Sequence, residues 1–495
     1  LSCGRRSWRS ATGIGKLWEV RCAAERADQG GAHLMARGSY CPGCFEKQRK
    51  IDQLLEENQT LKEKLRYQER KAQEGFFGSS TPSSKIPLKP DQGAERKPKG
   101  AKAGHKGSGR KGFQESEADQ VIEIGSQDRA PCPHCGGPLQ DKGSQERFVL
   151  DTAPFRVHRI LYRLCKKYCP HCKKVFQPTI PEVLPRSLYG NQLVATVAVM
   201  HYLHGIPMGR ICEQIHLSPG SLVELFHRLS RLLEKVPAQL IQDYRMCTVK
   251  HADETGWRTD GKNGYVWLFA TEKISIFQFR KSRSAEVPKA VFGPQRLAGV
   301  LVVDRYAAYN KVPCAIQYCY AHLLREVQDL EKEFPDSLEV KAFVNTLAPL
   351  LSLAMGLRHQ DLSDTEFQSK AATLKTQILH TVHRPATHLG VQHIQGIFRE
   401  QAERMYHWAE SRKVPADNNL AERDLRPTVI ARKTSFGSQS DAGAHTRGVL
   451  MSVLYSLKKR GVDVTAQLKG VLDELAKDIH QDPFALLFPR DSPTP

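Results

Sequence analysis

The chain has 495 residues, which is too long for one ordinary globular core and predicts two to four domains. Hydrophobic residues make up 40% and charged residues 25%, a composition that excludes a wholly disordered chain. Lysine and arginine number 73 against 53 aspartate and glutamate residues, a formal net charge of +20. This excess favours a polyanionic partner, most simply nucleic acid.

Membrane insertion and secretion are not expected. Apolar stretches such as Leu193–Met200 fall far short of the roughly 20 residues of a membrane span, and no long basic amphipathic helix stands out. Arginines near the start are not followed by the apolar segment of a signal peptide. The first methionine is Met35, so we expect residues 1–34 to be a non-native or disordered extension of a cytoplasmic protein, acting at the bacterial nucleoid.

Residues 45–74 are predicted to form a charged helix and a short coiled coil. Apolar residues recur at heptad a and d spacing, with one asparagine suited to setting the register: Ile51, Leu54, Asn58, Leu61 and Leu65. The alternative is a solvated helix packed on its own protein.

Residues 75–115 are rich in Gly, Pro and Ser and cannot bury a core, so we expect a flexible basic linker. Its candidate phosphate contacts are Lys97, Lys99, Lys102, Lys106, Arg110 and Lys111.

The 13 cysteines include paired Cys-x-x-Cys motifs, which suit metal ligation better than a disulfide framework. Cys132-Pro-His-Cys135 and Cys169-Pro-His-Cys172 supply the four thiolates that tetrahedral Zn²⁺ prefers. Residues 116–184 are therefore predicted to be a zinc ribbon with structural Zn²⁺. Cys41 and Cys44 form a third pair without an evident mate.

Residues 185–240 read as helical. A short helix over Met208–Ile215, a turn containing Ser218 and Pro219, and a second helix over Gly220–Leu233 resemble a DNA-binding helix-turn-helix. Two packed helices of a bundle produce the same pattern, so both interpretations stay open.

From residue 245 to about 440 the pattern changes to buried strands alternating with helices. The expected strands are Cys247–Trp257, Tyr265–Thr271, Ile274–Arg280, Gly299–Asp304 and Ala315–Tyr320. A helix over Ser284–Phe292 and another from His322 complete a βββαβαβα order, which is that of an RNase H-like fold. Residues 441–495 are expected to be helical.

Two acids stand out because burial of an unpaired carboxylate is costly. Asp253 lies within the first strand and Asp304 ends the fourth, and those strands are neighbours in this fold. Their oxygens suit Mg²⁺ or Mn²⁺, and two such ions about 4 Å apart assist phosphoryl displacement. A third carboxylate is then expected on a nearby helix.

Several motifs in the right order resemble the insertion sequence sixty-six transposases, a bacterial DDE group. They are Asp253-Glu-Thr-Gly-Trp257, Asp304-Arg-Tyr306, Ala321-His-Leu-Leu-Arg325, Asn418-Asn-Leu-Ala-Glu-Arg423, Leu425-Arg-Pro427 and Arg432-Lys-Thr-Ser-Phe-Gly437. The resemblance covers roughly residues 40–480. It implies the catalytic triad Asp253, Asp304 and Glu422, and a helical insertion at about 326–412.

The residues around Glu422 give independent support. Asn419 and Glu422 have the spacing of a capping box at a helix start. The candidate phosphate contacts beside them are Arg423, Arg426, Arg432 and Lys433. Cys319 and His322 form a Cys-x-x-His pair expected near the site, as a metal-proximal or DNA-contacting group or as plain packing.

The expected function is that of a DNA transposase, which frees a 3′-OH at the element end and joins it to target DNA. The chain would bind terminal inverted repeats, pair as a homo-oligomer on two ends, and work with accessory proteins of the same element. Two alternatives remain: a non-catalytic zinc-dependent DNA-binding protein, and an RNase H-like nuclease that cuts without joining.

Overall fold

The computed structural model describes residues 42–73, 116, 157–164, 167–171, 174–176 and 180–489. Several predictions fall outside these residues: the extension 1–34, the linker 75–115 with its basic residues, and the side chains of all four proposed zinc ligands. The short strands β1 (Lys167–Cys169) and β2 (Lys174–Phe176) pair antiparallel within the region predicted to be a ribbon. The zinc site itself therefore stays a prediction.

The predicted charged helix is confirmed as α2 (Pro42–Gln73), which belongs to the first of two compact units, residues 1–73. Its apolar heptad residues are exposed within this unit: Ile51 by 38%, Leu54 by 52% and Leu61 by 64%. This exposure is that of the helix within its own unit, so both pairing in a coiled coil and packing on the rest of the protein stay predictions.

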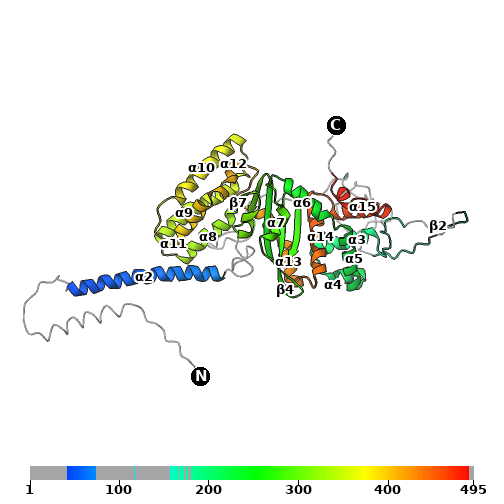
Figure 1. Cartoon of the computed structure of the whole chain (residues 1–495), viewed down its shortest axis with the longest axis horizontal. Helices are drawn as coiled ribbons and strands as arrows, with labels where there is room; N and C mark the ends of the chain where they lie inside the picture. Colours follow the sequence, from blue (N-terminus) through cyan, green and yellow to red (C-terminus); the bar gives the residue numbers. More distant parts are fainter. Residues whose placement is uncertain are drawn as a thin grey trace, which may run out of the picture. The chain divides into compact units, whose positions relative to one another are not determined.

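The second unit is built on a five-stranded mixed sheet with the order β5-β4-β3-β6-β7 (Figure 1). Its strands are β3 (Val249–Thr259), β4 (Lys262–Ala270), β5 (Ser275–Arg280), β6 (Val300–Val303) and β7 (Ala315–Tyr318). The first three form an antiparallel meander, and β6 and β7 join parallel to β3 and to each other. This is the strand order expected of an RNase H-like core.

The pairing of β3 with β6 decides where the acids lie. His251 pairs with Val302 in parallel register, so two residues further along the strands Asp253 comes level with Asp304. Leu301, Val302 and Val303 are fully buried, so both faces of β6 are covered, as in a central parallel strand.

The connection between β6 and β7 differs from the predicted order. It holds only a 3₁₀ turn, η5 (Ala307–Lys311), where an α-helix was expected. The linking segment has just eleven residues between the two strands, too few for a helix that crosses the sheet. The helix before β6, α7 (Glu286–Phe292), was predicted correctly.

The helices before the sheet match the prediction closely. They are α3 (Asn191–Ala198), the π-helix η4 (Val199–Leu203), α4 (Met208–Ile215), α5 (Pro219–Leu232) and α6 (Val236–Met246). The Ser218 side chain caps the start of α5 by accepting from the Ser221 N–H, and Pro219 is the first residue of the helix. Its buried face packs on α14 (Asp441–Lys459), as a bundle helix would, and DNA reading by the exposed side stays a prediction.

Helix α14 also covers the edge strand β5. The Ser456 hydroxyl accepts from the Ser275 N–H at 3.0 Å, and the Ser452 hydroxyl accepts from the Phe277 N–H at 2.9 Å. Gly448 lets the helix approach, because a Cβ there would lie 3.0 Å from the Phe277 carbonyl oxygen. An edge that would otherwise pair with other chains is thus satisfied by side chains. The chain ends with α15 (Val464–Lys477) and α16 (Pro483–Leu487).

A mainly helical insertion separates β7 from the later helix α13 (Asn419–Ser435), as predicted. It holds α8 (Tyr320–Glu333), α9 (Leu338–Leu357), α10 (Asp364–Val382), α11 (Leu389–Glu400), η6 (Ala402–Arg404) and α12 (His407–Glu410).

Helix α9 alone among the described helices has the length and apolar composition of a membrane span. Asn345 and Pro349 interrupt its apolar residues in the sequence. Its apolar face, including Phe343 and Leu347, is buried, and the helix contacts α8 and α10. Core helices pass the same test of length and composition.

Candidate active site

Asp253 and Asp304 project from adjoining strands and are held by backbone groups. The Glu254 N–H donates to Asp253 Oδ1 at 2.9 Å, and the Tyr306 N–H donates to Asp304 Oδ1 at 3.0 Å. Both side chains remain partly accessible from outside. The two predicted acids are therefore brought to one end of the parallel strand pair.

The electrostatics of this pair disfavour two negative charges. Burial raises the pKa of Asp253 well above its ordinary value, and the charges of neighbouring carboxylates, Asp304 and Glu422 among them, raise it further. Burial also raises the pKa of Asp304, opposed by the Tyr306 N–H and nearby arginines. A cation between the acids would relieve this repulsion.

Glu254 alternates to the opposite face of β3 from Asp253. Arg283 donates to Glu254 Oε1 at 2.7 Å and the Tyr309 hydroxyl donates to Oε2 at 2.5 Å. Burial and the Asp304 charge still raise the pKa of Glu254 to about 7. With both oxygens engaged, Glu254 is a structural partner of Arg283 rather than an open ligand.

Helix α13 is attached to β3 at both ends. At its start, the Asn418 Nδ2 donates to the Ala252 carbonyl at 2.8 Å, and its Oδ1 accepts from His251 Nδ1 at 2.9 Å. At its end, the Ser438 N–H donates to the Arg258 carbonyl at 2.9 Å. Gly437 has φ 127°, and a Cβ there would lie 2.2 Å from the same carbonyl oxygen. Glu422 is thus carried on a helix fixed along the strand that holds Asp253.

The predicted capping box does not form. Asn418, not Asn419, is the N-cap, and its side chain makes no cap hydrogen bond because it binds β3 instead. Glu422 does not reach back to the helix start. Its Oε1 accepts from Arg325 Nη2 of α8 at 3.1 Å.

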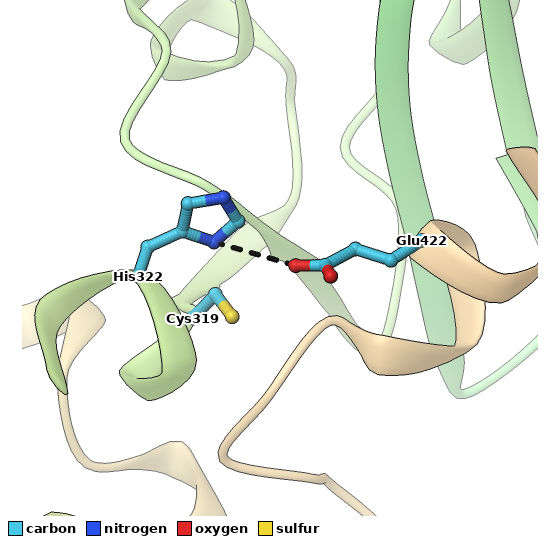
Figure 2. Close-up of side chains that lie close together, drawn as sticks. All are labelled: Cys319, His322 and Glu422. Carbon is cyan, nitrogen blue, oxygen red and sulfur yellow. Dashed lines mark ion pairs between the residues drawn. The ribbon is translucent and has the colours of Figure 1, made fainter. Parts of the chain in front are cut away.

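Glu422 lies in a cluster with Cys319 and His322 (Figure 2). One ligand atom from each lies within 4.8 Å of the others, and among the described residues this set, rather than the three acids, meets that criterion. Arg325, with Nη2 at 3.1 Å from Glu422 Oε1, holds the carboxylate in this position. Burial raises the pKa of Glu422, with Arg325 acting in the opposite direction. Joint metal binding by Asp253, Asp304 and Glu422 stays a prediction.

The basic residues of α13 divide between two faces. Arg423, Arg426 and Lys433 are exposed and recur at helical spacing on one side. Arg432 faces β3 instead, where it donates to the Thr255 hydroxyl at 3.3 Å and to the Gly256 carbonyl. Of the four predicted phosphate contacts on this helix, Arg432 is thus placed as an anchor to the sheet.

A family model described as "Transposase IS66 family" matches residues 186–446, more than half of the chain. The chain belongs to this family. Relatives that match this chain over most of their own length come from Sinorhizobium fredii (strain NBRC 101917 / NGR234). "Uncharacterized protein y4qI" is 26% identical over 74% of both chains, and "Uncharacterized protein y4jD" is 23% identical over 72% of this chain and 76% of its own.

Membership identifies a DDE transposase and implies DNA transposition, DNA binding and the use of divalent metal ions. The matched region begins before the helices that precede the sheet and ends within α14, so it includes all three predicted acids.

Sequence reasoning missed two residues that position Glu422 in this transposase. Asn418 and Arg325 both stand within motifs that were recognised, but neither was given a role. No periodicity marks them, because Asn418 lies 166 residues from the backbone oxygen it binds and Arg325 lies 97 residues from Glu422.

Buried histidines make the stability of this transposase sensitive to acid. Burial lowers the pKa of both His251 and His201 to about 4. The unfolded chain, with a histidine pKa near 6.5, binds these protons more readily than the folded one. Stability is therefore complete above about pH 6.5 and is lost as pH falls towards 4, by about 3 kcal/mol per histidine.

Urea unfolding between pH 7 and pH 4 measures this effect. His251→Gln is expected to flatten the pH dependence relative to wild type, and the exposed control His445→Gln is expected to keep it. Equal slopes for all three proteins would show that His251 does not carry the effect.

Proposed function

We propose that this transposase cuts DNA at the ends of its element and joins the freed 3′-OH to target DNA. The observation that carries this proposal is the level position of Asp253, within β3, and Asp304, directly after β6, with Glu422 on the helix fixed along β3. No covalent link between protein and DNA is required, because carboxylates serve as ligands and not as nucleophiles.

The donor set fits a hard divalent cation such as Mg²⁺ or Mn²⁺. Asp253, Asp304 and Glu422 offer only oxygen atoms, and burial raises the pKa of all three, so a bound cation would offset the cost of their negative charges. When bound, two such ions would activate the attacking oxygen and stabilise the leaving one. The chain's own part is to hold the three carboxylates by backbone N–H groups, by Asn418 and by Arg325.

The exposed side of α13 is suited to DNA. Arg423, Arg426 and Lys433 line it, while the acid between them, Asp424, turns inward to Lys459 and to the Ser275 hydroxyl. A row of cations with no opposing acid would hold phosphates next to Glu422.

Other parts of the chain would complete end recognition. The zinc ribbon with ligands Cys132, Cys135, Cys169 and Cys172, the linker 75–115 and the helices α4 and α5 would bind the terminal inverted repeats. The exposed heptad stripe of α2 would pair two protomers, which suits a reaction on two ends.

The test is to incubate the purified protein with Mg²⁺, labelled element ends and a target plasmid. Cleavage followed by joining to the plasmid is expected. Cleavage without joining would favour a nuclease, and binding alone would favour a non-catalytic DNA-binding protein.

The double variant Arg423→Ala/Arg426→Ala is expected to weaken DNA binding and to reduce the slope of log affinity against log salt by about 2. The reason is that two phosphate contacts and their counterions are lost. Fluorescence anisotropy over a salt series measures both quantities.

The matched control removes two exposed charges from the insertion, Lys341→Ala/Lys370→Ala. It should bind with an unchanged slope. A similar loss in both double variants would indicate a general charge effect and not a DNA-binding face on α13.

A further inference from the structure

Three side chains with three different donor atoms converge beside the acids. Cys319 is the N-cap of α8, His322 lies in the first turn of that helix, and Glu422 lies in the first turn of α13 (Figure 2). Their ligand atoms lie within 4.8 Å of one another, and His322 Nδ1 is 3.7 Å from Glu422 Oε1.

We propose that Cys319, His322 and Glu422 form a binding site for a thiophilic divalent cation of the zinc class, separate from the proposed magnesium site but sharing Glu422 with it. Sulfur and imidazole nitrogen are donors that Zn²⁺ takes readily and that Mg²⁺ does not. Three protein ligands with a fourth position left to water is a common zinc arrangement.

The distances are close to what tetrahedral zinc requires. Zn–S near 2.3 Å and Zn–N or Zn–O near 2.0 Å place neighbouring ligand atoms about 3.3–3.6 Å apart. The His322–Glu422 separation is already within a few tenths of an ångström of this range, and the other pairs need to contract by little more than about 1 Å.

A buried nitrogen points to a missing partner at this place. His322 Nδ1 is shielded from solvent and has no hydrogen-bond partner in the part of the chain that the structure describes. Leaving such an atom unsatisfied costs free energy, which a bound cation would recover. The Asn418 N–H donates to Cys319 Sγ at 3.1 Å, a hydrogen bond that fixes the position of the sulfur in the cluster.

Because Glu422 belongs to both proposed sites, zinc binding at one would affect magnesium binding at the other. A zinc-class ion on Cys319 and His322 would hold Glu422 away from Asp253 and Asp304, so micromolar zinc would inhibit magnesium-dependent cleavage. This consequence rests on the proposed function, whereas metal binding at the cluster does not.

The experiment measures zinc equivalents per chain for the full-length protein, equilibrated in a buffer of fixed free Zn²⁺. Wild type is expected to hold one equivalent more than Cys319→Ser and than His322→Gln, each with affinity at this site reduced by about 100-fold or more. The buried thiol variant Cys212→Ser should retain this equivalent. Two separate ligand variants, both checked by circular dichroism, guard against loss of fold in one of them.

Equal zinc content in wild type and both ligand variants would overturn the proposal. So would loss of the same equivalent in Asp304→Asn, because the ion would then belong to the acids. If the ligand variants lose zinc and wild type shows no cleavage under any condition, the proposed function fails while the zinc site stands.

Discussion

Asp253→Asn is expected to abolish DNA cleavage, with a rate at least about 1,000-fold below wild type, while binding to element ends is largely kept. A neutral amide withdraws one anionic ligand from the proposed metal site, and a thousandfold corresponds to about 4 kcal/mol of transition-state stabilisation. The asparagine oxygen can still accept from the Glu254 N–H that now holds Asp253 Oδ1, so the strand has no reason to move.

Asp253→Asn is not expected to lower the stability of the fold. The raised pKa of Asp253 reports a burial cost and repulsion from Asp304 and Glu422, both of which a neutral side chain removes. We therefore expect a melting temperature equal to or above that of wild type. Single-turnover cleavage, anisotropy and a thermal melt together make the measurement.

Asp260→Asn is the matched control, since it changes the same atoms on the exposed turn after the same strand. It should cleave at the wild-type rate. Loss of end binding in Asp253→Asn, in step with the loss of cleavage, would count against a metal-holding role for this acid.

Asn418→Ala is expected to destabilise the protein by about 2–4 kcal/mol and to lower cleavage as well. The amide is buried and bridges α13 to β3 through His251 and the Ala252 carbonyl. Alanine leaves both of those groups without their partner in a site closed to water. Because α13 carries Glu422, a looser start of this helix also misplaces the third acid.

The adjacent substitution Asn419→Ala provides the control, because Asn419 is exposed and its side chain makes no cap bond. It should change the free energy of unfolding by less than about 0.5 kcal/mol. Urea unfolding gives the stabilities, and cleavage is compared at a temperature where both variants are folded. If Asn418→Ala cleaved at the wild-type rate while folded, the positioning of Glu422 would not depend on this bridge.

Local patterns predicted the elements well where the physics is local. Period-two patterns and continuous apolar runs marked the five strands, and the helix Met208–Ile215 was predicted to the residue, since burial imposes a pattern that a sequence displays. The predicted α-helix between β6 and β7 was wrong. The short length of this connection, and not the helix propensity of its residues, decides its conformation.

By itself, the sequence determined the family and the placement of Asp253 and Asp304 on neighbouring strands. Each of these follows from residue types at fixed spacings along one strand or within one motif.

Only the tertiary structure decided how Glu422 is held and which charges face outward. Arg325 and Asn418 act on partners about 100 or more residues away, and the inward turn of Arg432 depends on a β3 carbonyl 176 residues earlier. The convergence of Cys319, His322 and Glu422 has the same origin. Such contacts are set by how helices pack on a sheet, and packing leaves no periodic trace in the order of the residues.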